Sequence, residues 1–306
     1  MFQFIVRRLI QLIPVLLGVT ILVFSLMHLS PGNPAHIIAG ENAPASTVEQ
    51  IENRLGLNDP IITQYFRFVK DAALLDFGNS WRTSLPVSSE LWPKFWVTFE
   101  LSIYSTIFSI FLGLFAGIIS AVRQYSFADI SIMLVALFGL SMPNFWLGLM
   151  LMQWFSIQLG WLPPTGWGTP QQIILPVITL GTMGAAVIAR MTRSSMLDVI
   201  SQDYIRTARA KGLKEKVVIY RHALKNALIP VVTVVGLQFG SLLAGSVLTE
   251  SVFAINGMGK LIVDRILARD FPVVQASVLI IAVVFVFVNL IVDISYKFLN
   301  KRIKLD

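Results

Sequence analysis

The stretch DYIRTARAKGLKEKVVIYRHALKNALIP, residues 203–230, is rich in basic residues, although the chain as a whole is mostly apolar. It carries seven lysines or arginines, although charged residues make up only 13% of the 306-residue chain and hydrophobic residues make up 55%. Soluble domains usually have about 25% charged residues, and the mean hydropathy here is +0.73. The composition therefore predicts a membrane protein, and the basic stretch is expected to form a loop between spans.

Six apolar runs are long enough to cross the bilayer as helices, which takes about 20 residues. The third run is the longest and predicts either one tilted helix with an interfacial end or two short segments. Short alternating segments, the pattern of a membrane β-barrel, are missing from the sequence. The fold class is therefore predicted to be an all-α membrane protein with six transmembrane helices, near residues 9–29, 97–122, 130–159, 173–189, 229–253 and 273–295.

The distribution of lysine and arginine predicts the orientation of these spans, because cytoplasmic loops carry an excess of both. With an even number of spans both termini lie on one side. That side, with the basic loop, receives 16 of the 24 lysines and arginines, and the other side receives eight. Both termini are expected in the cytoplasm. The first run follows Arg7 and Arg8 and is of span length, so it is expected to remain as a helix rather than to be cleaved as a signal.

Several classes of function are disfavoured by what the sequence lacks. The chain has no cysteine, and its three histidines are far apart, so no metal site or bound cofactor is expected. No G-x-x-x-x-G-K-[ST] phosphate-binding loop is present, and the nearest string, residues 257–260, lacks the first glycine and the hydroxyl residue. The net charge of +7 is explained by attraction to anionic membrane lipid, so no nucleic-acid partner is expected.

The segment between the first two spans, residues 30–96, is predicted to form a helical loop outside the cell. Ser46 and Glu49 have the spacing of a capping box at the start of a helix that Gly56 ends. Asp59 and Pro60 then predict the N-cap and first turn of a second helix, which runs to Leu75.

The basic stretch itself predicts two helices. Asp203 is placed to cap a short helix over residues 204–211, Gly212 to close it, and a return helix is expected from Lys214 toward Pro230. Small side chains in the short helix would let a partner protein approach closely, on a face shared by Tyr204, Thr207, Ala208 and Lys211. The alternative is an amphipathic helix that lies on anionic lipid.

The motif YIRTARAKGL, residues 204–213, resembles the cytoplasmic loop of inner-membrane permeases of ATP-binding-cassette importers, in the form found in the peptide and nickel branch. Aligned on Gly212, the segment 206–208 occupies the family's Glu-Ala-Ala, although the glutamate is absent. The resemblance continues in RLGLNDP (54–60), DFGNSW (76–81), and the stretches 7–35, 139–166 and 250–276, with departures at Asn33, usually Asp, and Asn256, usually Pro.

This resemblance implies a type I importer permease, a non-catalytic subunit of the bacterial cytoplasmic membrane that carries peptides. It implies four regions: residues 1–30, an extracytoplasmic loop 31–96, a core 97–296 with a coupling loop 194–228, and a basic tail 297–306. It also implies three kinds of partner: a paralogous second permease, two ATPase subunits that bind ATP, and an external solute-binding protein. The segment implied to dock on the ATPases comprises Tyr204, Ile205, Arg206, Thr207, Ala208, Arg209, Ala210, Lys211 and Gly212.

Four polar or helix-breaking residues interrupt the third run: Ser141, Met142, Pro143 and Asn144. They are predicted either to line the transport pathway or to fit a bend in the helix. Glu100, Glu250 and Asp293 lie near predicted helix ends, where a carboxylate reaches the interface, and a structural role is expected for them. Gly113 and Gly117 have the spacing of helix packing positions.

Two other classes of function remain to be compared with the importer. A secondary transporter would show inverted repeats and charges at the membrane midplane, and neither pattern is clear. A membrane-embedded enzyme would need a nucleophile paired with a base, or a ligand cluster, inside the spans. No such pair stands out in the sequence.

Overall fold

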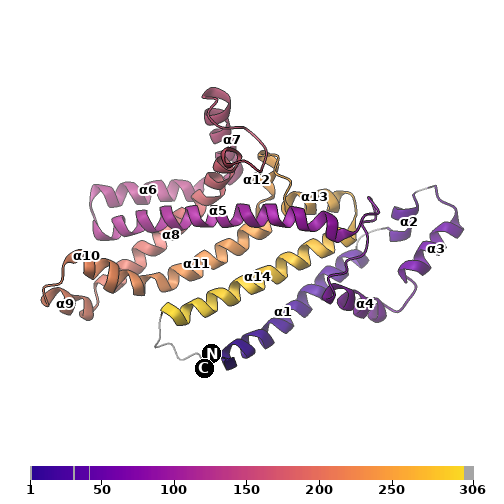
Figure 1. Ribbon diagram of the computed structural model, residues 1–306, viewed down its shortest axis with the longest axis horizontal. Helices are drawn as coiled ribbons and strands as arrows, with labels where there is room; N and C mark the ends of the chain where they lie inside the picture. The colour runs from indigo at the N-terminus through magenta and orange to yellow at the C-terminus, as the bar shows by residue number, and fades with distance from the viewer. Residues whose placement is uncertain (1, 30–31, 41, 300–306) are drawn as a thin grey trace. The chain divides into compact units, whose positions relative to one another are not determined.

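The computed structural model describes residues 2–29, 32–40 and 42–299, and these residues are helical apart from turns, loops and one isolated bridge between Asn79 and Pro86. The predicted all-α fold class is therefore confirmed. The chain divides into two compact units, residues 1–96 with 256–286 (unit 1) and residues 97–255 with 287–306 (unit 2). Two long helices contribute to both units, α5 (Val87–Val122) and α14 (Phe271–Leu299) (Figure 1).

Within the described residues, five helical segments are long and apolar enough to cross a membrane, and a bent pair of helices makes a sixth if it counts as one span. The bent pair, α6 (Phe127–Ser141) with Asn144–Gln158, turns by 103° at its break, so the third predicted run forms two short segments rather than one tilted helix. The five others are Ile10–Leu29, Val87–Val122, Pro170–Ile200, Glu215–Leu243 and Phe271–Val292.

Unit 1 contains a long first helix and several short ones. They are α1 (Phe2–Leu29), α2 (Pro34–Ala39), α3 (Ala45–Leu55), α4 (Ile61–Ala73) and α13 (Met258–Leu267), together with parts of α5 and α14. Asn33, where the family resemblance leads one to expect Asp, caps α2 by accepting a hydrogen bond from the amide of Ala35 at 2.9 Å. Asparagine is as good an N-cap as aspartate, so this departure is neutral for the turn.

Two predicted helix starts in unit 1 are wrong. The helix α3 begins after Pro44 and has no side-chain cap, so Ser46 and Glu49 do not form a capping box, although Gly56 ends the helix as predicted with a φ of 65°. Helix α4 begins after Pro60 and ends at Ala73. Asp59 does not cap it, because its carboxylate is bound by Arg67 at 2.5 Å. In both cases the proline fixes an extended backbone before the helix, and that backbone sets the start.

The loop between α4 and α5 is fastened to the first turn of α14 by a buried carboxylate. Asp270 is completely buried and accepts hydrogen bonds from the Ser80 hydroxyl at 2.5 Å and from the Trp81 amide at 3.0 Å. Trp81 also packs edge-on against Phe271, with 5.9 Å between ring centroids. These contacts order the loop within unit 1.

Unit 2 is organised around α8 (Pro170–Ile200), which contacts α6, α7 (Asn144–Leu151) and α11 (Leu224–Gly245) (Figure 1). The unit also contains η1 (Met152–Gln158), α9 (Asp203–Ala210), α10 (Glu215–Val217), η2 (Val218–Ala223) and α12 (Val247–Val252). Helix α8 is the most buried of the candidate spans.

Helix α5 packs against α8 through its glycines. A Cβ atom added to Gly113 would lie 2.7 Å from the Cβ of Ile188, and one added to Gly117 would lie 2.6 Å from the carbonyl oxygen of Ala189. Real Cβ atoms do not come this close, so only glycine lets the two helices approach to this distance. The predicted packing role of both glycines is confirmed.

Candidate functional site

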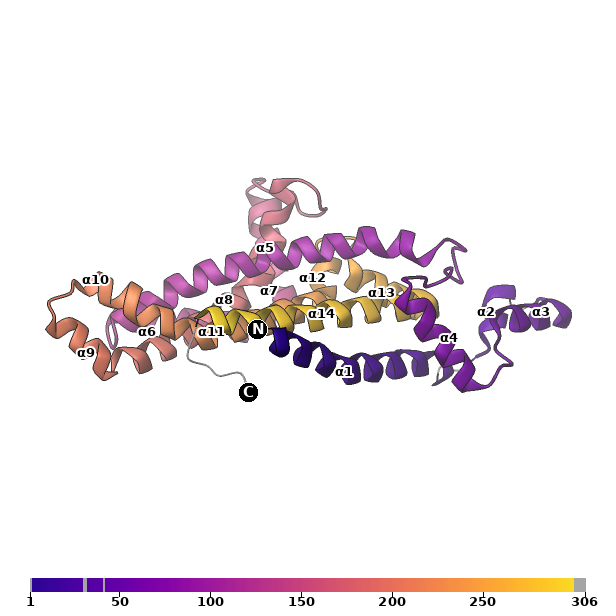
Figure 2. The same ribbon diagram turned by 60° about the horizontal axis from the view of Figure 1, so that its bottom comes forward.

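Helix α9 and the chain that follows it form one end of unit 2 (Figure 2). The helix begins after Gln202, which provides no side-chain cap, so the prediction that Asp203 caps the helix is wrong. Asp203 is the first helical residue instead. Gly212 has a φ of 75°, and its amide donates to the carbonyl of Arg209 at 2.9 Å. Glycine adopts this left-handed conformation at little cost, so Gly212 closes the helix as predicted.

Helix α9 turns one apolar face into the unit. Ile205 is completely buried and Ala208 is 7% exposed. Both belong to a cluster of buried residues that also contains Ala121, Met196, Val218, Ile219, Ala223 and Ala227. Ala208 was expected on the face that meets a partner, and the structure corrects this. Ala208 lies three positions after Ile205, which places both on the same side of the helix.

The opposite side of α9 is exposed and carries Asp203, Arg206, Thr207 and Ala210. We call these four residues the outer ridge. The Arg206 side chain is 75% exposed and reaches Asp203 only at 3.6 Å, so it is largely solvated. Two members of the ridge, Thr207 and Ala210, have small side chains. The ridge therefore offers a partner a close approach, flanked by a positive charge.

Two polar contacts hold α9 against the return helix. Arg209 donates to Glu215 through Nε at 3.1 Å and through Nη2 at 2.6 Å, and this pairing raises the pKa of the Arg209 guanidinium. The Asn226 amide donates to the Tyr204 hydroxyl at 2.8 Å. Exposed ion pairs stabilise by less than about 1 kcal/mol, so these contacts mainly fix the orientation of α9.

The return helix forms as predicted but with a different register. It begins at Glu215, widens into the π-helical turn η2, and continues as α11 through Pro230 to Gly245. In a regular α-helix the spacing of Val217, Tyr220, Leu224 and Leu228 would place them on one apolar face, but Val217 and Tyr220 are exposed by 36% and 58%. A π turn inserts an extra residue into the helix, and the buried positions shift accordingly to residues 218, 219, 223 and 227.

The four residues 141–144 form the break between α6 and α7. Met142 is extended, with φ −78° and ψ 131°, and Pro143 precedes the first residue of α7. A residue before proline is driven out of the helical region, which explains the bend. Ser141 and Pro143 are exposed and Met142 and Asn144 are half-buried, and their predicted role in lining the pathway stays a prediction.

The three carboxylates expected near helix ends have different environments. Glu100 is exposed, but it lies within α5 rather than near the end of a helix, because α5 begins at Val87. Glu250 does not reach an interface, because it is completely buried and accepts hydrogen bonds from the hydroxyls of Thr98 at 2.7 Å and Ser246 at 2.5 Å. The side chain of Asp293 lies outside the described residues. A completely buried carboxylate is held only by such partners.

Sequence reasoning missed an ion pair between α6 and α8. Asp129 has a side chain that is 4% exposed, and Arg193 donates to its two oxygens at 2.7 and 2.8 Å. The Ser120 hydroxyl and the Tyr125 amide donate to the same carboxylate. The available signal was an acid directly before the third apolar run and a base four residues after the fourth, since charges this close to membrane spans are expensive unless they are paired.

The exposed end of unit 2 has the features of a surface on which another protein can dock. Among the residues that the structure describes, no group of three or more His, Cys, Asp or Glu side chains could hold a metal ion. The exposed features of this end of unit 2 are a small-residue ridge, its flanking basic side chains and a closing glycine.

Comparison with known families accounts for nearly the whole chain. Residues 113–305 match the family described as binding-protein-dependent transport system inner membrane component. Residues 1–102 match a second family, which describes the N-terminal part of such membrane components.

Two proteins with similar sequences are named as transport permeases. The chain is 48% identical to the dipeptide transport system permease protein DppB of Alkalihalophilus pseudofirmus, over 99% of this chain and 100% of that one. It is 45% identical to the glutathione transport system permease protein GsiC of Escherichia coli K12, over 99% of both chains. Among solved structures, an inward-facing MetNI methionine ABC transporter matches with a TM-score of 0.60 at 17% identity, over 69% of this chain and 96% of that one.

Proposed function

This chain belongs to the family of binding-protein-dependent transport system inner membrane components, and from that premise we propose that it forms half of a peptide pathway driven by separate ATPases. It is a multi-pass permease subunit of an ATP-binding-cassette importer with the type I fold.

The observation that best supports the proposal is the way in which α9 is held against the rest of unit 2. Its inner face, at Ile205 and Ala208, is anchored in the buried cluster of unit 2, while Arg209 and Tyr204 are tied to the return helix. A helix held in this way transmits a force to α8 and α11, the long helices that precede and follow it in the chain. The outer ridge is then the surface that an ATPase subunit contacts.

The ATPases supply the energy, because the sequence has no phosphate-binding loop of its own. ATP binds to those partners, and this chain holds no cofactor and has no catalytic role. When two ATPases close on ATP, they move α9 as a lever and swing the attached spans. The orientation that places α9 in the cytoplasm rests on the excess of lysine and arginine in this loop.

Short peptides are the proposed cargo. Two relatives that align over nearly the whole chain are named for dipeptide and glutathione transport, and both of those compounds are short peptides. A solute-binding protein delivers the cargo from outside, and a second permease completes the pathway. The bend at residues 141–144 contributes exposed and half-buried side chains to that pathway.

The test is co-purification with variants of the outer ridge. Ala210→Arg adds a long cation to the ridge without entering the buried cluster, whereas Ala208→Arg would also disrupt packing. Ala73→Arg, at the exposed C-terminal end of α4, is the matched control. The tagged chain is extracted gently from its native host, and its companions are identified by mass spectrometry.

The proposal predicts that the wild type and Ala73→Arg retain a second permease and one or two ATPases, and that Ala210→Arg loses the ATPases while it keeps the permease. If Ala210→Arg retains the ATPases, the outer ridge is not part of the interface with them. A wild-type chain that comes out alone would favour a secondary transporter whose basic loop lies on lipid.

A further inference from the structure

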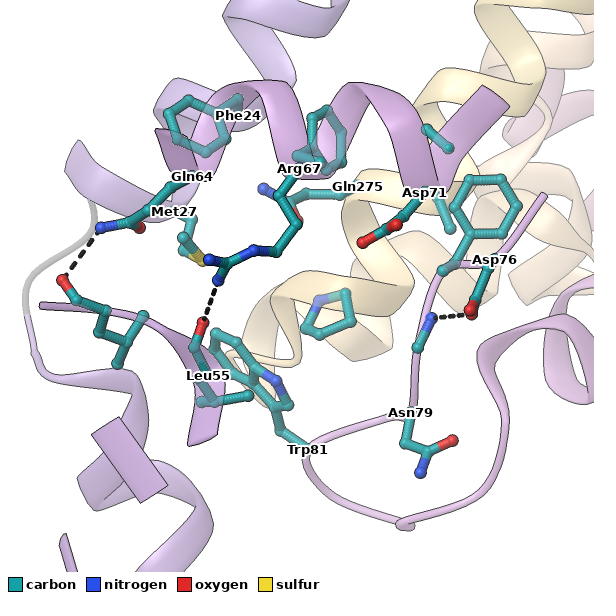
Figure 3. Close-up of a pocket in the computed structure, with 17 residues that line it drawn as sticks. Phe24, Met27, Leu55, Gln64, Arg67, Asp71, Asp76, Asn79, Trp81 and Gln275 are labelled. Carbon is teal, nitrogen blue, oxygen red and sulfur yellow. Dashed lines mark hydrogen bonds between the residues drawn. The ribbon is translucent and has the colours of Figure 1, made fainter. Parts of the chain in front are cut away.

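Unit 1 contains a cavity of about 280 Å³ between α4, the outer end of α1, the loop after α4 and the first turns of α14 (Figure 3). We call it the α4 cavity. All of its lining residues belong to unit 1. It lies away from α9 in the chain, and the proposed docking of ATPases makes no use of it. The predicted orientation places it on the external side.

Four aromatic side chains form part of the walls of the α4 cavity. Phe24 of α1, Phe68 of α4, and Phe77 and Trp81 of the following loop all line it. Phe24 is also packed against Phe68, with 5.9 Å between ring centroids. Aromatic faces attract cations as well as apolar groups, and the attraction is worth about 0.5–2 kcal/mol for a cation over a ring.

Three of the residues that line the cavity, Asp71, Asp76 and Gln275, present hydrogen-bond acceptors. Gln275 is 7% exposed, and its Nε2 donates to the carbonyl of Val23 at 3.1 Å. Its Oε1 accepts no hydrogen bond within the part of the chain that the structure describes. The half-buried carboxylate of Asp71 likewise has no partner there, and Asp76 accepts one bond, from the amide of Gly78 at 3.0 Å. Because Gln275 lines the cavity, its Oε1 is open to a hydrogen-bond donor that enters there.

One cation lines the cavity, and it is already neutralised. Arg67 donates to the carboxylate of Asp59 at 2.5 Å and points its Nη1 toward the carbonyl of Leu55, as Figure 3 shows. The positive charge of Arg67 is therefore paired with Asp59. Among the described residues, Asp71, Asp76 and the Oε1 of Gln275 have no cationic partner, and they lie in the same cavity as the four aromatic rings.

We propose that the α4 cavity binds a protonated amine that carries an apolar group. An ammonium has three donors and no acceptor, which matches Asp71, the Oε1 of Gln275 and the aromatic faces. The apolar group would occupy the space beside Phe24 and Trp81. The volume is at the small end for ligand pockets, so the cavity holds one end of a larger molecule rather than the whole of it.

This chemistry has two sources on the external side. One is the free amino end of a peptide, and the other is a lysine side chain of the delivering solute-binding protein. Both sources rest on the proposed function, since each assumes a chain that receives peptides from such a protein. The class of ligand, an amine with an apolar neighbour, is the same for the two.

The experiment uses the intact transport complex in lipid nanodiscs and isothermal titration calorimetry. The probes are the dipeptide alanyl-phenylalanine, its N-acetylated form, and the cognate solute-binding protein without peptide. The test variants are Asp71→Asn, which removes the charge at constant shape, and Ala72→Leu, which fills the cavity from the same helix. Glu49→Gln, at an exposed site of α3 that does not line the cavity, is the control.

Loss of a charge-assisted hydrogen bond predicts a fall in affinity of about 10- to 100-fold. A wild type that prefers the free dipeptide to the acetylated one, with this fall in Asp71→Asn and Ala72→Leu, supports a peptide amine. If the affinity falls only for the solute-binding protein, the amine that enters the cavity is a lysine side chain of that protein. If both variants bind the dipeptide and the solute-binding protein with unchanged affinity, the proposal is overturned. Retention of ATPases in the same preparation shows that such a failure concerns the cavity alone.

Discussion

Replacing Arg193 with methionine should destabilise unit 2 strongly, because it leaves the carboxylate of Asp129 buried without its cation. Arg193 makes two hydrogen bonds to Asp129, at 2.7 and 2.8 Å, and the two side chains are only 25% and 4% exposed. Breaking a buried ion pair on one side costs about 3–5 kcal/mol. Ser120 and Tyr125 still donate to the carboxylate, so we expect about 3 kcal/mol.

Unfolding by SDS in mixed micelles, followed by tryptophan fluorescence, measures this change in the free energy of unfolding. Arg190→Met is the matched control, since Arg190 lies on the same helix, is exposed, and has no ion pair within the described residues. Its effect should stay within about 0.5 kcal/mol. The double variant Asp129→Asn/Arg193→Met removes both charges and should recover most of the loss. Equal destabilisation by Arg193→Met and Arg190→Met would refute the reasoning.

Three further predictions concern packing, backbone and orientation. Gly117→Leu should cost at least about 1–3 kcal/mol by overpacking against α8, whereas Gly18→Leu, with nothing within 4 Å of its Cβ position, should not. Equal losses in SDS titration would contradict the close contact. Gly212→Ala should cost about 1–2 kcal/mol, since alanine is strained at a φ of 75°, and an unchanged unfolding curve would count against that backbone. The chain has no cysteine, so Asn58→Cys should react with an impermeant maleimide on intact cells and Lys216→Cys only after permeabilisation; the reverse would invert the topology.

The membrane spans could be predicted from the sequence because they depend on length and composition alone. Lipid leaves no alternative to the helix for an apolar run of about 20 residues, and five of the six predicted runs appear as long helices. The break in the third run was visible as well, since Pro143 excludes the helical conformation at Met142. The choice between one tilted helix and two short segments needed the structure.

Helix starts and faces were harder to predict, because tertiary contacts decide them. Ser46 had the spacing of a cap, but the backbone at Pro44 starts α3 without one. Ala208 is small enough for either side of α9, and only the cluster around Met196 shows that it faces inward. The shift of register in the return helix comes from a π turn, which has no simple sequence pattern.

The buried polar groups were the least predictable part of the site. Asp129 and Arg193 are 64 positions apart in the sequence, and Glu250 is 152 positions from Thr98. A local pattern cannot indicate such partners, although a charge within an apolar run indicates that a partner is needed. The α4 cavity has the same origin, because it is assembled from segments that are distant along the chain.

Cysteine crosslinking from α9 tests the central claim, that the outer ridge contacts an ATPase. A single Ala210→Cys variant in the native complex, treated with a short bifunctional reagent, is compared with Thr63→Cys, an exposed position of α4. The account predicts a crosslink between Ala210→Cys and an ATPase subunit, which weakens or strengthens when ATP is added, and none from Thr63→Cys. A chain that crosslinks to no ATPase from Ala210→Cys, while ATPases are present in the complex, would contradict it.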